Sequence, residues 1–321
     1  MKNNPVVSIV TPSYNKGSFV EETILSIKNQ TYPHIEHIVM DGGSTDGTLD
    51  ILKKYSNNLI WISEPDKGQS DAINKGWRMA KGEILAYLNA DDTYMPWTVE
   101  TAVKYLVVHP DVDMIYGKCN LIDEDGMVTG QYPYLSAEFD LAKLICSPCI
   151  IPQPTVFFKR QVLDTTGYLD TNLHMAMDYD LWIRIGLKCK IEYIPEVLAN
   201  FRVCPGTKTV DQTYKFWDDH SYILKALFSH PELPKEVRNL KWWAYSNLHA
   251  MRGSYYYSLG QMQKAREHFL KSLILHPIGL YKDRLLLFYL FRSFLGSKAT
   301  KAIMDCRRKL IIRSQKKSAD D

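Results

Sequence analysis

The acidic and amide side chains of segment 89–92, Asn-Ala-Asp-Asp, are of the kind that binds a metal ion. The segment follows an apolar run at 84–88 that is typical of a buried strand. Carboxylate oxygen suits hard divalent cations, and a cation that bridges two phosphates neutralises the charge of a departing diphosphate. Asn and Asp are also common where a strand turns, because they form local hydrogen bonds there. Taken alone, the segment leaves both interpretations open.

A glycine-rich segment at 41–47, Asp-Gly-Gly-Ser-Thr-Asp-Gly, follows another apolar run. Glycine lets the backbone approach a ligand closely, and the Asp41 carboxylate could accept a hydrogen bond from a nucleobase N–H. Thr45 or Asp46 is suited to cap the helix that comes next. The segment is not the dinucleotide-binding pattern GxGxxG, and it does not follow the first strand. A glycine-rich turn with a helix cap explains it equally well.

Two aspartates, Asp178 and Asp180, stand at the start of a predicted helix that continues through Ile185. Acids at a helix start gain from the helix dipole, which accounts for one of them as a cap. Because the two side chains point to different sides of the helix, the second needs another explanation. We expect one aspartate to cap the helix and the other to face a substrate as a general base.

These segments are positioned by a regular alternation of strands and helices. The predicted strands are 6–10, 37–40, 59–62, 84–88 and 114–116, and the predicted helices lie at about 19–29, 48–55, 70–80 and 97–109. Such alternation is typical of an α/β fold, with a mainly parallel, Rossmann-like sheet flanked by helices. Ligands bind beyond the carboxyl ends of the strands in these sheets. Acidic residues follow three of the first four strands, so this edge is the predicted ligand site.

The C-terminal third has a different, all-helical pattern. Residues 243–276 resemble one tetratricopeptide-type helical hairpin, and a lone hairpin of this kind must pack on a neighbour to bury its apolar face. We therefore predict a domain at 1–212, with a nucleotide-binding half at about 1–118 and an acceptor half at about 119–212. A helical extension follows at 213–321.

The composition excludes several classes of protein. With 45% hydrophobic and 23% charged residues the chain is typical of a folded protein, and a net charge of +3 is too small to indicate nucleic-acid binding. No run approaches the roughly 18 apolar residues of a membrane span, and no signal peptide is visible. The six cysteines are then expected to be reduced, in the cytoplasm. Cys146 and Cys149 form a CxxC without a second pair, which favours free thiols over a zinc or redox site.

The three polar segments, in this order and spacing, resemble the family-two glycosyltransferases with the GT-A fold. The opening at 7–15, Val-Ser-Ile-Val-Thr-Pro-Ser-Tyr-Asn, is similar to the start of that family, and the similarity extends over about 6–208. The resemblance implies a metal-dependent enzyme that moves a sugar, with inversion, from a nucleotide-diphosphate donor to a hydroxyl acceptor. Cell-surface polysaccharide or lipopolysaccharide synthesis is the implied setting, with a glycan or lipid-linked glycan as the acceptor.

The resemblance also implies roles for individual residues. Asp178 falls at the position of the catalytic base, and Asp91 at that of the ligand of a Mg or Mn ion. The implied nucleotide contacts are Thr11, Pro12, Tyr14, Asp41, Gly42, Asp71, Asn89 and Ala90. The diphosphate or acceptor side is assigned to Asp92, Gln153, Arg202 and Lys208.

Two positions depart from the family pattern. Asn89 replaces the first aspartate of the metal motif, so that one anionic group becomes a neutral amide. Cys204 stands where relatives often carry a histidine near the diphosphate, and a neutral thiol is a poor substitute. Arg202 and Lys208 would then supply more of the charge. These departures keep a second hypothesis open, a nucleotide-sugar-binding protein without catalysis.

The end of the chain is basic. An apolar stretch at 285–295 precedes a run of Lys and Arg, a pattern that suits the surface of an anionic membrane. The alternative is a helix that packs on the catalytic domain or forms a homodimer. With the membrane interpretation, the protein would lie in the cytoplasm at the inner face of the plasma membrane.

Two further classes are less well supported. An interaction protein built on the helical hairpin would need about three repeats, and only one is present. A nucleotidyltransferase would share the sheet and its acidic edge, but the first strand is not followed by a phosphate loop rich in Gly, Lys and Arg.

Overall fold

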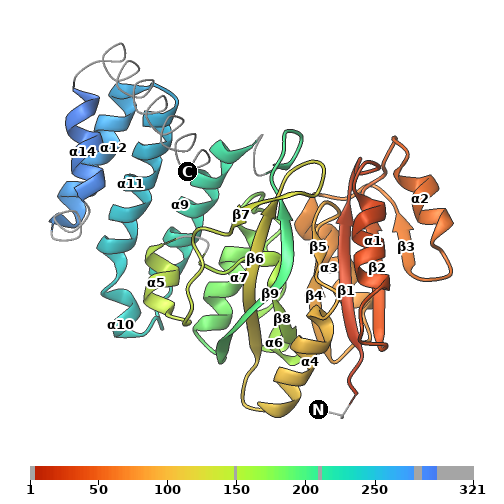
Figure 1. Cartoon of the computed structure of the whole chain (residues 1–321). Coiled ribbons are helices and arrows are strands. Elements are labelled where there is room, and N and C mark those ends of the chain that lie inside the picture. The colour runs from red at the N-terminus through yellow and green to blue at the C-terminus, as the bar shows by residue number, and fades with distance from the viewer. Residues whose placement is uncertain (1–3, 148–149, 209–211, 278–283, 295–321) are drawn as a thin grey trace, which may run out of the picture. The chain divides into compact units, whose positions relative to one another are not determined.

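The computed structural model describes residues 4–147, 150–208, 212–277 and 284–294 (Figure 1). The described residues divide into two compact units, one within 4–144 and 150–219 and the other within 145–147 and 220–294. The division falls within helix α9 (Thr213–Ser229), and the predicted boundary after residue 212 stays a prediction. Cys149, half of the CxxC, and the basic tail at 295–321 lie outside the described residues. The cysteines in the described part, at 119, 146, 189 and 204, are free thiols.

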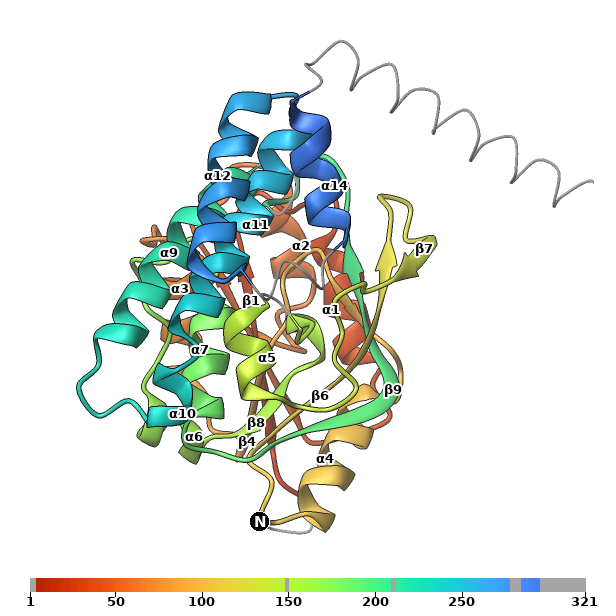
Figure 2. The same cartoon turned by 90° about the vertical axis from the view of Figure 1, so that its left-hand side faces the viewer.

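The first unit is built on one mixed sheet. Its parallel part has the order β3-β2-β1-β4, with β1 at Val7–Ser13, β2 at Ile35–Asp41, β3 at Ile60–Ser63 and β4 at Ile84–Tyr87. The sheet then continues through β8 (Phe157–Lys159), β6 (Met114–Ile122), β9 (Ile191–Arg202) and β5 (Thr93–Tyr94). β7 (Val128–Gln131) pairs with β6 and forms a hairpin with it (Figure 2). The predicted α/β class with a mainly parallel sheet is confirmed.

Helices cover the parallel strands because the central strands β1 and β4 are buried on both faces. Every residue of β1 is buried. The connecting helices are α1 (Val20–Lys28), α2 (Thr48–Lys54), α3 (Gln69–Met79) and α4 (Thr98–Val108). Helix α3 packs tightly on β1 at Gly76, where a Cβ atom would lie 2.5 Å from Val10 Cγ1. This close contact holds the start of α3 next to the carboxyl ends of the strands.

The second half of the sheet contains the strands that the sequence pattern did not predict. β8 is antiparallel to both β4 and β6, and β5 is antiparallel to β9. The short elements around them are α5 (Leu141–Cys146), the 3₁₀ turn η1 (Gln153–Thr155), α6 (Gln161–Thr166) and α7 (Met177–Gly186). Strands of two or three residues carry too little periodicity to be recognised, and their partners are distant in sequence.

The second unit is helical, as predicted. It contains α10 (Lys235–Arg238), α11 (Lys241–Ser258), α12 (Met262–Leu275) and α14 (Arg284–Ser293). The last three lie side by side (Figures 1 and 2) around a small core of Tyr257, Ala265 and Phe269. A Cβ at Gly253 would lie 2.5 Å from Phe269 Cδ1, so α11 and α12 are closely packed. Within the described ranges, none of the helices is long and apolar enough to cross a membrane.

Candidate active site

The loops after β1 and β2 are joined by hydrogen bonds at the carboxyl edge of the sheet. Asn15 adopts a left-handed backbone conformation, with φ of 50°. Its backbone N–H donates to Ser44 Oγ at 2.8 Å, and its Oδ1 accepts from Thr45 N at 2.9 Å. The Gly42 N–H donates to Ser13 O at 2.8 Å. The two loops therefore form one rigid rim.

Asp41 is the centre of that rim. Its carboxylate is only 2% exposed and accepts hydrogen bonds from Gly43 N, Ser44 N, Ser44 Oγ and Ser63 Oγ at 2.5–3.1 Å. These contacts make it the anchor of the glycine-rich loop. A contact between Asp41 and a nucleobase stays a prediction.

Tyr14 is the exposed member of the predicted nucleotide group, with 62% of its surface accessible. A Cβ at Gly42 would lie 3.4 Å from Tyr14 Cδ2 and 2.7 Å from Asp66 Oδ2, so this glycine leaves room for both side chains. Thr11 and Pro12 are buried instead, and Thr11 Oγ1 hydrogen-bonds His37 Nε2 at 2.9 Å. The structure thus places Tyr14 and Gly42 at the surface of the rim, and Thr11 beneath it.

Asp71 lies in the first turn of α3 and has partners of its own. Its carboxylate accepts from Lys67 N at 3.2 Å and is 3.4 Å from Lys75 Nζ. Burial by itself would raise the pKa of Asp71. The contacts with the Lys67 N–H and Lys75 outweigh this effect and hold the pKa below its ordinary value. Asp71 is therefore an ionised group at the end of the third strand's loop.

Asn89 connects segment 89–92, which is called the metal motif below for its predicted role, to two other elements. Its Oδ1 accepts from Gln69 Nε2 at 2.7 Å, and its Nδ2 donates to Asp92 Oδ2 and Gln153 Oε1, both at 3.1 Å. Gln153 is held in turn by a 2.8 Å hydrogen bond from its Nε2 to Tyr87 O. The residue that departs from the family pattern thus serves as a junction, with an amide that both donates and accepts. Ala90, next to it, is buried.

Asp92 and Arg202 fix the motif from inside the protein. Asp92 is fully buried and accepts a 2.9 Å hydrogen bond from Arg202 N. Burial and the neighbouring charge of Asp91 raise the pKa of Asp92 well above its ordinary value.

The Arg202 guanidinium is also buried, with 2% of the residue exposed. It donates to the carbonyls of Asp91, Asp123 and Glu124 and forms an ion pair with Glu22. The guanidinium also lies over the ring of Phe19, with Arg202 Cζ 4.7 Å from the ring centroid. The structure therefore shows Arg202 as a clamp between loops, and its assignment to the diphosphate stays a prediction.

Asp91 is the accessible carboxylate of the motif. It forms an ion pair with Lys16 in the loop after β1, with Nζ and Oδ2 2.7 Å apart. Among the residues that the structure describes, no three His, Cys, Asp or Glu side chains are grouped so as to hold a metal ion. Burial raises the pKa of the nearby Cys204 thiol, which keeps it protonated and a poor ligand. The assignment of Asp91 as a metal ligand stays a prediction.

Asp178 lies in the first turn of α7. Its Oδ1 accepts from Tyr179 N at 2.8 Å. Burial raises the pKa of Asp178 to about 6, against the opposing effects of the Tyr179 N–H and the positive charge of Lys208. A carboxylate with this pKa is ionised at neutral pH and still basic enough to accept a proton.

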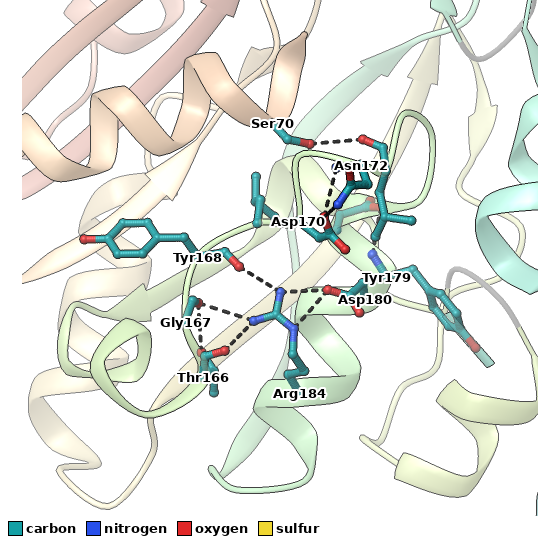
Figure 3. Close-up of polar contacts among 12 residues, drawn as sticks. Ser70, Thr166, Gly167, Tyr168, Asp170, Asn172, Tyr179, Asp180 and Arg184 are labelled. Atoms are coloured by element: carbon teal, nitrogen blue, oxygen red, sulfur yellow. Dashed lines mark hydrogen bonds and ion pairs between the residues drawn. The ribbon is translucent and has the colours of Figure 1, made fainter. Parts of the chain in front are cut away.

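Asp180, unlike Asp178, forms an ion pair with an arginine of its own helix. Figure 3 shows Asp180 with this partner, Arg184. Its Oδ2 accepts from Arg184 Nε at 2.9 Å and from Arg184 Nη2 at 2.7 Å. Arg184 also donates to the carbonyls of Thr166 and Tyr168. Asp180 therefore holds, through Arg184, the segment that leads into α7.

Lys208 links the surroundings of Asp178 to the metal motif. Its Nζ donates to Gln69 Oε1 at 2.9 Å, and Gln69 donates to Asn89. Burial lowers the pKa of Lys208, and the charges of Asp178 and Asp219 oppose that shift. Predicted residues from three distant segments, Lys208, Asn89 and Gln153, are thereby joined in one hydrogen-bond network, and the charge of Lys208 acts on the nearby Asp178.

Sequence reasoning missed Lys16, Gln69 and Asp219. Lys16 and Gln69 each follow the carboxyl end of a predicted strand, so their place in the loops was a usable signal. Asp219 lies within a helix beyond the recognised motifs and gave no such signal.

Helix α3 also positions α7. Ser70 Oγ donates to Leu173 O at 3.2 Å (Figure 3). Asn74 exchanges two hydrogen bonds with the Leu169 backbone, at 2.8 and 3.0 Å. The segment before α7 is thus attached to the helix that carries Gln69.

Comparisons with known proteins agree with this geometry. The family model described as glycosyl transferase family 2 matches residues 8–164. An uncharacterized glycosyltransferase of Mycobacterium tuberculosis is 32% identical over 206 residues, which cover 63% of this chain and 76% of that protein. The putative teichuronic acid biosynthesis glycosyltransferase TuaG of Bacillus subtilis is 28% identical over 209 residues, covering 62% and 79%.

Two solved structures are similar in fold. TarS 1-349 of S. aureus in complex with UDP-GlcNAc has a TM-score of 0.64 at 17% identity and covers 94% of this chain and 92% of its own. The mannosyltransferase PcManGT of Pyrobaculum calidifontis, in complex with GDP-Man and Mn2+, has a TM-score of 0.60 at 21% identity, covering 91% and 86%. The sheet and its flanking helices are therefore those of the GT-A fold.

Proposed function

The chain belongs to glycosyl transferase family 2, and on that premise we propose that it transfers a sugar from a nucleoside-diphosphate donor to a hydroxyl group of a glycan, with inversion. The observation that carries the proposal is the network Lys208–Gln69–Asn89, which joins the surroundings of Asp178 to the metal motif. A base and a site for the leaving group are needed within one substrate's length, and this network supports such proximity.

Asp178 acts as the general base in this proposal. It takes the proton of the acceptor hydroxyl as the acceptor oxygen forms its bond to the anomeric carbon. The bond from that carbon to the phosphate oxygen breaks at the same time, and its electrons leave with the nucleoside diphosphate. A single displacement of this kind inverts the anomeric configuration. The raised pKa of Asp178, about 6, makes the proton transfer more favourable than an ordinary aspartate would.

The leaving diphosphate would lie between Asp91, Lys16 and Lys208. A divalent cation, Mg or Mn, would be held by the Asp91 carboxylate and would neutralise the charge of the leaving group. The Lys16 ammonium, which is paired with Asp91 in this structure, would turn to a phosphate oxygen when the cation is present. Lys208 would contribute the charge that the neutral Cys204 thiol does not supply.

The donor's base would stack on Tyr14, above Gly42. The exposed ring of Tyr14 and the rigid rim beneath it support this placement. The related folds bind UDP-GlcNAc and GDP-Man, and both are nucleoside-diphosphate sugars. A cell-surface polysaccharide is the proposed product, on the example of the teichuronic acid relative. The acceptor would be a glycan or a lipid-linked glycan.

The helical unit would bring the enzyme to an anionic membrane at the inner face of the plasma membrane. On α14 and just beyond it, Leu287, Phe291 and Phe294 are 39%, 68% and 59% exposed. The 27 residues that follow contain eight Lys and Arg against three Asp. Exposed aromatics next to cations suit an interface with anionic lipid. Flotation of the full chain with anionic and with neutral vesicles tests this, and equal binding to both contradicts it; a homodimer would show as doubled mass in solution.

The transfer reaction is tested by assaying donor consumption and glycan product with Mn2+, for the wild type and for Asp178→Asn. We expect the variant to lose turnover by about 10²–10⁴-fold while its affinity for the nucleoside diphosphate is retained. Unchanged turnover in the variant would remove Asp178 from the role of base.

A second candidate, a nucleotide-sugar-binding protein without catalysis, is favoured by one observation, the Lys16 ion pair that occupies Asp91. It predicts donor binding with neither transfer nor donor hydrolysis in the wild type. The same assay therefore separates the two functions.

A further inference from the structure

A carboxylate from another helix caps the segment that leads into α7. Oδ2 of Asp219, on α9, accepts hydrogen bonds from three successive backbone N–H groups, His174 at 2.8 Å, Met175 at 2.6 Å and Ala176 at 3.1 Å. Asp219 is 8% exposed and belongs to the same compact unit as α7. Successive N–H groups that point to one place form a nest for an anion, and here the anion is part of the protein.

Helix α7 has no cap of its own. Ala176, at its N-cap position, has no side chain that accepts a hydrogen bond. Helix starts leave N–H groups without intrahelical partners, and a residue with an oxygen in its side chain usually satisfies one of them. Asp219 takes over that function from 43 residues further along the chain.

The capped segment ends two residues before Asp178. Its position therefore determines where the Asp178 carboxylate stands relative to Lys208 and the metal motif. Burial lowers the pKa of Lys208, and the charges of Asp178 and Asp219 both oppose that shift. Tyr87 also lies near Asp178.

We propose that Asp219 is a positioning residue for transfer, which holds the start of α7 so that the Asp178 carboxylate is directed to the acceptor hydroxyl. The inference rests on the proposed function of Asp178 as the base. Asp219 itself touches neither substrate nor reacting atom. It acts by fixing the backbone at 174–176 and by placing a negative charge at the start of the helix.

The test compares Asp219→Asn, Asp219→Ala and a matched control, Asp113→Asn. Asp113 also accepts a hydrogen bond from a backbone N–H, that of Lys190 at 3.1 Å, but it precedes β6 at the opposite edge of the sheet. We expect Asp219→Ala to reduce the turnover number by roughly 10²-fold, because small misplacements of a reacting group have effects of this size. Affinity for the nucleoside diphosphate is expected to be retained, and Asp219→Asn, which keeps an oxygen acceptor, should lose less.

Two readouts separate positioning from a general loss of structure. Amide hydrogen exchange at 174–176 should accelerate in Asp219→Ala and not in the control. The second readout is the split between turnover and binding: Asp219→Ala should lower the turnover number while its dissociation constant for the nucleoside diphosphate stays near that of the wild type. Wild-type turnover in Asp219→Ala, or reduced turnover with unchanged exchange at 174–176, would overturn the inference.

The outcome for Asp178→Asn keeps this test separate from that of the proposed function. If Asp178→Asn is inactive and the Asp219 variants are fully active, only the positioning role of Asp219 fails. If Asp178→Asn is fully active, the base assignment fails and the inference fails with it.

Discussion

The donor edge and the base side of the site are built in different ways. The donor edge comprises the loops after β1 to β4, and the order of the parallel strands alone brings these loops together. The base side comprises segment 166–178 and Lys208. The order of the strands does not fix the position of these residues. The base side is held by Arg184, Asn74 and Asp219 through individual side-chain contacts. Binding of the donor therefore depends on the sheet, whereas the position of the base depends on a few long-range hydrogen bonds.

The largest expected effect concerns the donor edge. Arg202→Met would keep the backbone N–H that Asp92 accepts, but it would leave the carbonyls of Asp91, Asp123 and Glu124 without the guanidinium donor, so we expect a loss of about 1–3 kcal/mol in the free energy of unfolding for each of these bonds. Arg78→Met is the control, because Arg78 is exposed and lies 4.8 Å from the Tyr168 ring centroid. Denaturant unfolding measures both. A similar small loss in the two variants would show that Arg202 is not the clamp that the structure indicates.

The second effect should separate the two regions. Asn74→Ala would leave the buried Leu169 N–H and C=O without partners, at about 1–3 kcal/mol. Because Asn74 holds the base side, turnover should fall while donor affinity is retained. Turnover and titration calorimetry with a nucleoside diphosphate measure the split. If donor affinity falls as much as turnover, the two regions are not independent in the way described.

The third effect is a pH dependence confined to the base side. The pKa of Asp178 is raised to about 6 by burial, so the ionised base is lost as the pH falls through that value. Below pH 6 turnover should decrease about tenfold per pH unit, while donor binding changes less.

Ionisation of Asp178 has the opposite effect on stability, because it supports turnover but lowers the free energy of unfolding. The folded-state pKa of Asp178 lies above the unfolded value, so its ionisation destabilises the fold as the pH rises from about 4 to 6. Asp178→Asn should therefore be more stable than the wild type at neutral pH, as thermal unfolding would show. A variant of lower stability at pH 7 would contradict this sign.

The smallest effect concerns Lys16. Its pair with Asp91 is partly exposed, with side chains 22% and 14% accessible, and such pairs contribute up to about 1 kcal/mol. Lys16→Met removes this competitor, so Mn2+ alone, without donor, should bind up to about fivefold more tightly. Titration calorimetry checks this, with Lys53→Met as a control whose pair with Asp50 is on the surface. Weaker binding of Mn2+ to Lys16→Met would mean that Lys16 supports the cation site rather than competes for it.

Much of the donor edge could be predicted from sequence. Runs such as 6–10 and 84–88 are almost entirely apolar, which indicates strands buried on both faces, and the acids that follow three of the first four strands must then meet at one edge. The helix with Asp178 and Asp180 was also recognised, since its pattern is local. Gln153, Asn89 and Lys208 do lie in one network, but their chemical roles stay predictions until they are tested.

The parallel strands β1 to β4, the acids that follow three of them and the helix that carries Asp178 can thus be predicted from sequence. Three features are visible only in the folded protein: Arg202 is buried in carbonyl contacts, Lys16 pairs with Asp91, and Asp219 caps the segment before α7. The difference is one of range. Hydrophobic periodicity is read over neighbouring residues, whereas the hydrogen bonds of Arg202 to Asp92 and of Lys208 to Gln69 join residues 110 and 139 positions apart. A local pattern cannot contain such a pairing, because it arises only when the sheet has assembled.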